Sequence, residues 1–180
     1  AESLPTGTAL RGRNDDPLFV SRSLRVVGDV WTFVYKAAAE IGELGDNTRA
    51  MRRQMIDDDV LRHVISQPGA RVSIIGHTRW ASVGIISEPN AHPVTGEEVG
   101  RPSPLVLAVL NGDVDNYADL KVEHGLRVAE SITTDAKVIP SLVARQLDDG
   151  TGLDDAFIRD RKSTRLNSSH VSESRMPSSA

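Results

Sequence analysis

The sequence of 180 residues contains no cysteine. This absence excludes disulfide bonds and any metal site built on thiolate ligands. The five histidines do not fall at the short spacings that are typical of zinc ligands on one helix or turn. The sequence therefore predicts no metal site and no cofactor.

Long hydrophobic runs and an excess of basic charge are lacking as well. No segment approaches the roughly 18 consecutive apolar residues needed to span a bilayer, and the N-terminal residues do not have the pattern of a secretory signal. The formal net charge is −4, and residues of both signs are scattered along the chain. We therefore expect a cytoplasmic protein that binds neither membranes nor nucleic acid.

The length predicts one domain with a different composition at each end. Residues 1–17 are rich in glycine, proline, asparagine and aspartate, which indicates an irregular start of a fragment. Residues 161–180 are rich in serine and poor in apolar residues, so burial cannot offset the entropy of ordering them. We expect a disordered tail there, and its composition resembles non-native sequence from a cloning linker. The domain itself is expected over residues 18–160.

Strands and helices are expected to alternate within this domain. Residues 18–35 are β-branched and aromatic between turn formers, which favours antiparallel strands. Apolar residues recur at three- and four-residue steps from Met51 to Ile65, which predicts one amphipathic helix capped by Asn47 or Thr48. Buried strands are expected over 71–80 and 105–114, with a polar loop between them. A last helix is expected over 134–147, kinked or delayed in its start by Pro140.

Polar side chains stand at the ends of the two expected buried strands. The first strand runs into Arg79 and Trp80, and the second runs into Asn111 and Gly112. Strand ends that open on loops often present a binding site on a rigid scaffold. Each feature also has an ordinary structural explanation: a surface arginine, a core tryptophan, and a type I′ turn at the Asn-Gly pair.

Two further segments are ambiguous in the same way. Asp135 follows Thr133 and Thr134 at a helix start, where it is either an N-terminal cap or a carboxylate that faces a ligand ammonium. His92 lies in a polar loop between prolines and is either packed there or part of a site.

Other kinds of site have little or no support in the sequence. The acidic residues after Gly112 lack the glycine and glutamate that a calcium loop requires further along. Neither a phosphate-binding glycine loop nor a G-x-S-x-G nucleophile turn is present.

Taken in order, these segments resemble class II glutamine amidotransferase domains. The segments are Gly76-His77-Thr78-Arg79-Trp80-Ala81, Asn90-Ala91-His92-Pro93, Asn111-Gly112 with Asp115-Asn116, and Thr134-Asp135. The match spans about residues 71–147 and is closest in kind to the glutaminase domains that supply ammonia for making glucosamine 6-phosphate from fructose 6-phosphate. The resemblance implies an α+β fold, an αββα sandwich of the N-terminal-nucleophile hydrolase type that is incomplete at its N-terminus.

The resemblance also implies roles in binding glutamine. Arg79 binds the α-carboxylate, a task that suits a planar fork of donors. Asp135 binds the α-ammonium, and the Asn111 amide with the Gly112 backbone N–H forms an oxyanion hole. The residues expected to line the pocket are Trp80, Ser82 and His92. Ser82 and Val83 depart from the threonine and histidine that are commoner at these positions.

The missing cysteine separates this chain from the family pattern. In the family an N-terminal cysteine attacks the glutamine side chain, whereas this sequence has none. We expect a fragment of an amidotransferase that is inactive alone and that becomes active when an extension supplies the cysteine. The parent chain would also hold a sugar-phosphate isomerase domain, absent here. The alternative is a non-enzymatic relative that binds an amino acid or a partner protein.

Overall fold

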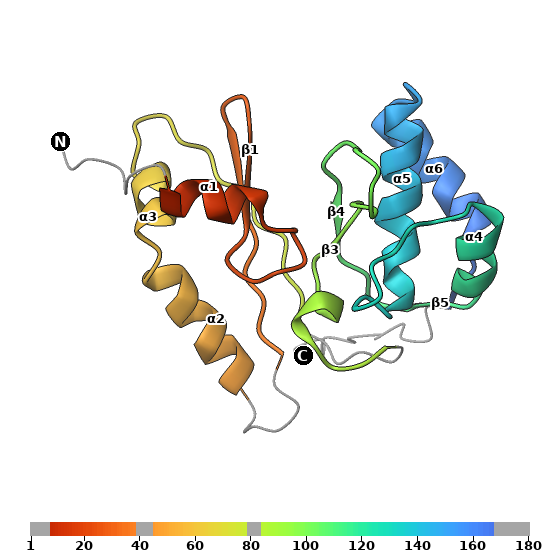
Figure 1. Cartoon of the computed structure of the whole chain (residues 1–180), viewed down its shortest axis with the longest axis horizontal. Coiled ribbons are helices and arrows are strands. Elements are labelled where there is room, and N and C mark those ends of the chain that lie inside the picture. Colours follow the sequence, from red (N-terminus) through yellow and green to blue (C-terminus); the bar gives the residue numbers. More distant parts are fainter. Residues whose placement is uncertain (1–7, 39–44, 79–83, 168–180) are drawn as a thin grey trace, which may run out of the picture.

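The computed structural model describes residues 8–38, 45–78 and 84–167, and these form two halves (Figure 1). The first half contains α1 (Thr8–Asp15), β1 (Leu24–Val27), β2 (Val30–Phe33), α2 (Asp46–Ile56) and α3 (Asp59–Ile65). The second half contains η1 (Glu88–Asn90), β3 (Val94–Thr95), β4 (Leu107–Ala108), β5 (Asp113–Val114), α4 (Tyr117–Glu123), η2 (Asp135–Lys137), α5 (Val138–Asp148), α6 (Leu153–Ser163) and β6 (Leu166–Asn167). The segment that follows α3 runs between the halves (Figure 1).

The strands form small antiparallel ladders. Across the described residues there are three two-stranded sheets, which pair β1 with β2, β3 with β4, and β5 with β6. The mixture of helices with antiparallel strands agrees with the α+β class expected from the sequence. The two stacked sheets that the resemblance implies are not seen within these residues, so the sandwich stays a prediction.

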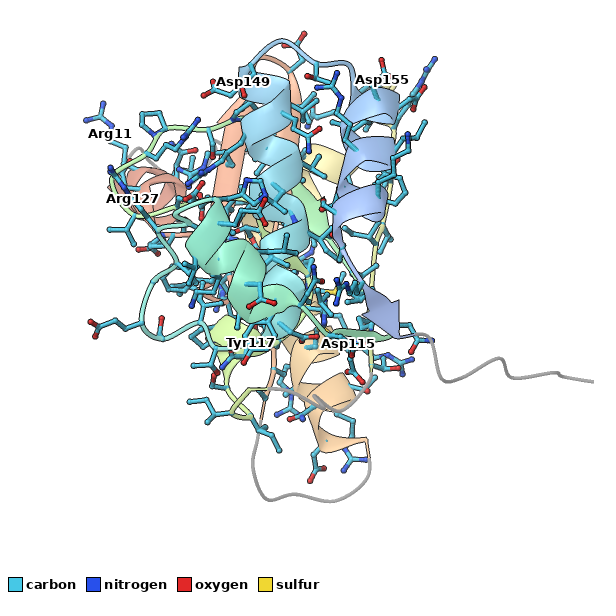
Figure 2. All side chains as sticks on the ribbon, turned by 90° about the vertical axis from the view of Figure 1, so that its right-hand side faces the viewer. Arg11, Asp115, Tyr117, Arg127, Asp149 and Asp155 are labelled. Carbon is cyan, nitrogen blue, oxygen red and sulfur yellow. The ribbon has the colours of Figure 1, made fainter. Side chains whose placement is uncertain are left out.

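The hydrophobic core of the second half lies between α4, α5 and β5. It consists of Val114, Leu120, Leu126, Val138, Ile139 and Leu142, all buried. Figure 2 shows α5 and α6 side by side, with the labelled Asp115 and Tyr117 where β5 leads into α4. This packing holds η2, and therefore Asp135, in a fixed place at the start of α5.

The long helix expected to begin at Asn47 is divided in two. Asp58 has extended backbone, and its carboxylate accepts hydrogen bonds from the N–H groups of Val60 and Leu61 at 3.1 Å each. This side chain therefore ends one helix and caps the next. The apolar pattern also overstates burial, because α2 has no buried residue and Ile56 is 68% exposed.

The prediction of a buried strand over 71–80 is wrong for its described part. Residues 70–78 are assigned to no strand, and 71–76 are exposed, with Ile74 at 78%. An apolar run becomes a strand only where it pairs with a neighbouring strand, and no described strand pairs with residues 71–78. The expected strand over 105–114 is reduced to the short strands β4 and β5, with the Asn111-Gly112 bend between them.

The two ends of the chain also differ from expectation. An irregular start was expected over 1–17, but α1 occupies Thr8–Asp15. In the tail, α6 continues to Ser163, and Leu166–Asn167 pair with β5. Backbone pairing in β5–β6 orders these residues despite their polar composition. The division into a domain over 18–160 and flanking segments is still a prediction.

The last helix begins late, as Pro140 predicts. The backbone first forms the turn η2, and Pro140 then lies in the first turn of α5, where a missing N–H costs no helical hydrogen bond. The close contact of β3 with this helix depends on Gly96. A Cβ at Gly96 would lie 2.7 Å from the Pro140 carbonyl oxygen and 2.8 Å from the Ala144 Cβ.

We therefore expect Gly96→Ala to lower the free energy of unfolding by about 1–3 kcal/mol, since overpacking forces the backbone to shift. Urea denaturation measures this loss through the midpoint of unfolding. Gly152→Ala is the matched control, because a Cβ at Gly152 meets no atom within 4 Å. Equal midpoints for the two variants would mean that β3 and α5 are not in close contact.

Candidate functional site

A cavity of about 190 Å³ lies where the two halves meet. Its size suits a small metabolite, since pockets for drug-sized ligands are larger, about 300–1,000 Å³. Segments far apart in the sequence contribute to its walls. The lining residues fall in 36–38, 47–51, 77–78, 85–92, 110–112 and 134–136.

Asp135 supplies a buried carboxylate to this cavity. The residue is 4% exposed, and its Oδ2 accepts a hydrogen bond from the Val114 N–H at 2.5 Å. Its Oδ1 accepts a longer bond from the Thr134 hydroxyl at 3.4 Å. The bond to Val114 joins the start of η2 to the segment that follows Gly112. Two of the motifs found in the sequence are therefore in direct contact.

Asn90 joins a third motif to the same place. Its Oδ1 accepts hydrogen bonds from the backbone N–H groups of Thr133 at 2.7 Å and Thr134 at 3.0 Å. Its Nδ2 donates to the Ile85 carbonyl at 3.0 Å and to the Ser87 hydroxyl at 2.9 Å. All four bonds form while the side chain is buried, so Asn90 fixes the backbone immediately before Asp135.

Gly84 allows the close approach of the chain on this side. Its φ is +99°, and a Cβ there would lie 3.0 Å from the Thr133 hydroxyl oxygen and 3.1 Å from the Thr134 nitrogen. A side chain at this position would be strained by its backbone angle and would collide with the segment before Asp135. The glycine therefore lets the 84–92 loop pack against the 133–135 segment.

Two imidazole rings form another part of the wall. The ring centroids of His77 and His92 are 4.4 Å apart. Burial, together with the nearby His77, lowers the pKa of His92 to about 4, so this ring is neutral at neutral pH. Its Nδ1 is buried, and no atom of the described part of the chain is hydrogen-bonded to it.

Lys36 is a lining residue that the sequence analysis did not identify. It follows β2, is 1% exposed, and contributes to the cavity wall. Burial and the nearby Lys137 ammonium lower its pKa to about 8. The sequence feature that could have identified this residue is a single lysine within the apolar stretch from Trp31 to Ala38. Such a stretch places a charge among buried neighbours.

The residues predicted for the site divide into three groups. Gly112, His92 and Asp135 line the cavity. Asn111 is exposed and is not among the lining residues, although it precedes Gly112 directly. Arg79, Trp80 and Ser82 lie outside the described residues, so their positions relative to Asp135 stay predictions.

Comparison with known proteins identifies the relatives of this chain. It is 37% identical over 97 residues to the glutamine–fructose-6-phosphate aminotransferase (isomerizing) of Halalkalibacterium halodurans, an alignment that covers 54% of this chain and 15% of that protein. The enzyme of the same name from Bacillus thuringiensis subsp. konkukian is 31% identical over 137 residues, or 76% of this chain and 19% of its own length. That from Leifsonia xyli subsp. xyli is 36% identical over 123 residues, or 66% and 18%. The chain is a homologue of these aminotransferases.

Homology to glutamine–fructose-6-phosphate aminotransferases confirms the resemblance drawn from the motifs. No family model matches the chain. The chain covers only 15–20% of the length of these aminotransferases, so most of each relative has no counterpart here. Their activity as whole enzymes therefore does not transfer directly to this chain.

Two kinds of feature are absent from the described residues of this aminotransferase homologue. The described residues include no group of three or more histidine, aspartate or glutamate side chains placed to hold a metal ion. They also include no helix that is long and apolar enough to cross a membrane.

Proposed function

We propose that the cavity binds glutamine and that the chain is part of a glutaminase domain with the αββα sandwich of N-terminal-nucleophile hydrolases. The observation that carries this proposal is the buried Asp135 carboxylate in a cavity that Gly112 and His92 also line. Homology to aminotransferases that use glutamine by name supports the choice of ligand.

Each end of a glutamine molecule has a partner in this proposal. Asp135 binds the α-ammonium through a charge-assisted hydrogen bond. The Gly112 N–H and the Asn111 amide stabilise the oxyanion that forms when the side-chain amide is attacked. Arg79 binds the α-carboxylate, while Trp80, Ser82 and His92 enclose the ligand. Holding both charges of the zwitterion selects free glutamine over glutamine within a peptide.

The nucleophile is not supplied by this sequence, since it has no cysteine. In the whole protein, we propose, a cysteine-led segment releases ammonia from glutamine. A sugar-phosphate isomerase domain then uses that ammonia to make glucosamine 6-phosphate, in the cytoplasm. The missing cysteine also favours a second function, in which a non-enzymatic relative binds an amino acid or a partner protein. Glutamate release by a chain extended with an N-terminal cysteine separates the two, because only the glutaminase gains activity.

Glutamine binding is the direct test of the proposed site. Isothermal titration calorimetry with L-glutamine is expected to detect binding to this chain, and Asp135→Asn is expected to weaken it by roughly 10- to 100-fold. That range corresponds to about 1.5–3 kcal/mol for a hydrogen bond to a charged group. Asparagine keeps an acceptor for the Val114 N–H but removes the charge.

Asp115→Asn is the matched control, since Asp115 is exposed and follows Val114, which is hydrogen-bonded to Asp135 (Figure 2). Its affinity for L-glutamine is expected to equal that of the unmodified chain. No heat of binding in the unmodified chain, or equal affinities for the Asp135 and Asp115 variants, would contradict the proposed site.

A further inference from the structure

The backbone of Lys36 is held on both sides, which fixes the direction of its side chain. Its N–H donates to the Ser21 hydroxyl at 2.8 Å, and the same hydroxyl donates to the Lys36 carbonyl at 2.8 Å. The Gln54 amide donates to this carbonyl as well, at 3.3 Å. Both backbone groups of Lys36 are therefore hydrogen-bonded within the first half of the molecule. Its side chain is buried and contributes to the cavity wall.

The Lys36 ammonium has no hydrogen-bond acceptor among the residues that the structure describes. The Glu88 carboxylate attracts this ammonium but is not hydrogen-bonded to it. Two other charged groups nearby already have partners. The Lys137 ammonium donates to the Thr95 carbonyl and to the Glu97 carbonyl, while the Glu97 carboxylate pairs with Arg25 at 2.9 Å. A buried charge without a partner is costly, so such a group is usually paired or close to a ligand.

The cavity therefore presents charges of both signs. Lys36 contributes a cation from the first half, and Asp135 contributes an anion from the second. An α-amino acid carries a carboxylate and an ammonium on neighbouring atoms, so it can pair with both Lys36 and Asp135. A simple anion would leave Asp135 unmatched, and a simple amine would leave Lys36 unmatched.

We propose that Lys36 binds the carboxylate of a small amino acid whose ammonium is bound by Asp135. This inference rests on the proposed function and adds to it a cation that the motifs do not contain. The ligand class is narrowed to amino acids with a free carboxylate.

NMR of the lysine side chains tests this contact directly. The sequence has only four lysines, so a chain labelled with ¹³C at lysine gives few signals to assign. Saturating L-glutamine is expected to raise the pKa of Lys36, which is about 8 without ligand, by roughly one unit or more, because an opposite charge at contact distance favours the ammonium. Lys162 is the internal control, since its side chain is exposed and does not line the cavity.

Calorimetry supplies the second measurement, with L-glutamine and its α-amide, in which an uncharged carboxamide replaces the carboxylate. The unmodified chain is expected to prefer L-glutamine by at least tenfold, and Lys36→Met is expected to reduce that preference severalfold. Lys162→Met, an exposed lysine, is the control and keeps the full preference.

The outcomes separate this inference from the proposed function. Glutamine binding with an unchanged pKa of Lys36 and an unchanged preference in Lys36→Met overturns the inference and leaves the function standing. Absence of glutamine binding contradicts the function, and sodium acetate then serves as the carboxylate probe. A pKa of Lys36 that acetate does not raise overturns the inference as well.

Discussion

Lys36→Met is expected to raise the free energy of unfolding at pH 7 by about 3 kcal/mol. Burial and the Lys137 ammonium lower the pKa of Lys36 from 10.5 to about 8 in the folded protein. One pKa unit corresponds to about 1.4 kcal/mol, so folding at neutral pH carries a penalty for burying this charge. Methionine keeps a flexible apolar side chain of similar length and removes the charge.

The pH dependence distinguishes this cause from a packing effect. Below pH 8 the lysine is charged in both states, so the full penalty is present. Between about pH 8 and 10.5 the unfolded chain binds more protons than the folded one, and the stability of the unmodified protein rises with pH. The advantage of Lys36→Met is therefore expected to shrink over this range and to vanish above it. Glu88 and Glu97 oppose the lowering of the Lys36 pKa, and the pKa of about 8 already includes their attraction.

Urea denaturation at pH 7 and at pH 10 measures both effects. Lys162→Met serves as the control, since its side chain is exposed, and its stability is expected to match that of the unmodified protein at both values of pH. A loss of stability in Lys36→Met at pH 7, or a gain that does not depend on pH, would show that the ammonium is not the cause.

Lys36 thus connects stability with function. The same substitution is expected to stabilise the chain and to weaken binding of a carboxylate ligand. Binding sites often retain groups that lower stability, because those groups are arranged for the ligand and not for the empty fold. A stabilised variant that binds glutamine as well as the unmodified chain would argue against a ligand at Lys36.

The sequence predicted which segments lie close together better than it predicted the sheets. The Asn-Gly pair, His92 and Asp135 were identified by residue type and order, which depend little on how the strands pair. Gly112, His92 and Asp135 do line one cavity. The sequence does not identify Lys36 as a site residue. Two properties distinguish it: its side chain is buried, and its ammonium has no acceptor within the described chain. Neither property can be read from local sequence.

The strand over 71–80 shows the opposite case. Its β-branched residues favour a strand locally, but strand formation needs a partner, and pairing is a property of the whole fold. The helix from Asn47 was predicted as one element because the apolar period continues across Asp57–Asp58. What divides it is Asp58, whose carboxylate caps α3 locally and is held in place by hydrogen bonds from Arg13 and Tyr35, which are distant in sequence. Local pattern predicts the kind of element, whereas distant contacts decide its limits.

Asp58→Ala is expected to lower the free energy of unfolding by about 3–5 kcal/mol, the range for removing one partner of a buried ion pair. Arg13 donates to the Asp58 carboxylate with both terminal nitrogens, at 3.1 and 2.6 Å, and the Tyr35 hydroxyl donates at 2.7 Å. The same carboxylate caps α3 through the N–H groups of Val60 and Leu61. Alanine leaves all these donors without their acceptor and leaves the partly buried guanidinium without its counter-ion.

The stability loss in Asp58→Ala is expected to shrink as the pH falls, whereas the stability gain in Lys36→Met shrinks as the pH rises. Burial alone would raise the pKa of Asp58, but the hydrogen bonds from Arg13, Tyr35 and Leu61 together hold it below its usual value. The carboxylate therefore stabilises the fold fully above the ordinary aspartate pKa of about 3.9, and this contribution is lost as the pH falls through the lower folded value. Asp58→Asn, which keeps an acceptor but no charge, is expected to lose less than Asp58→Ala.

Asp59→Ala is the matched control for the prediction at Asp58. Asp59 is the next residue, its side chain is 76% exposed, and its pair with Arg62 at 2.8 Å lies on the surface of α3. Exposed pairs of this kind contribute only about 0.2–1 kcal/mol. The urea midpoint of the control at pH 7 is therefore expected to lie close to that of the unmodified protein. Similar losses at the two positions would mean that α3 tolerates loss of its cap and that Asp58 does not join α1, the β2 segment and α3. A large loss at Asp58 alone would instead identify this carboxylate as the contact that holds the first half together beside the cavity.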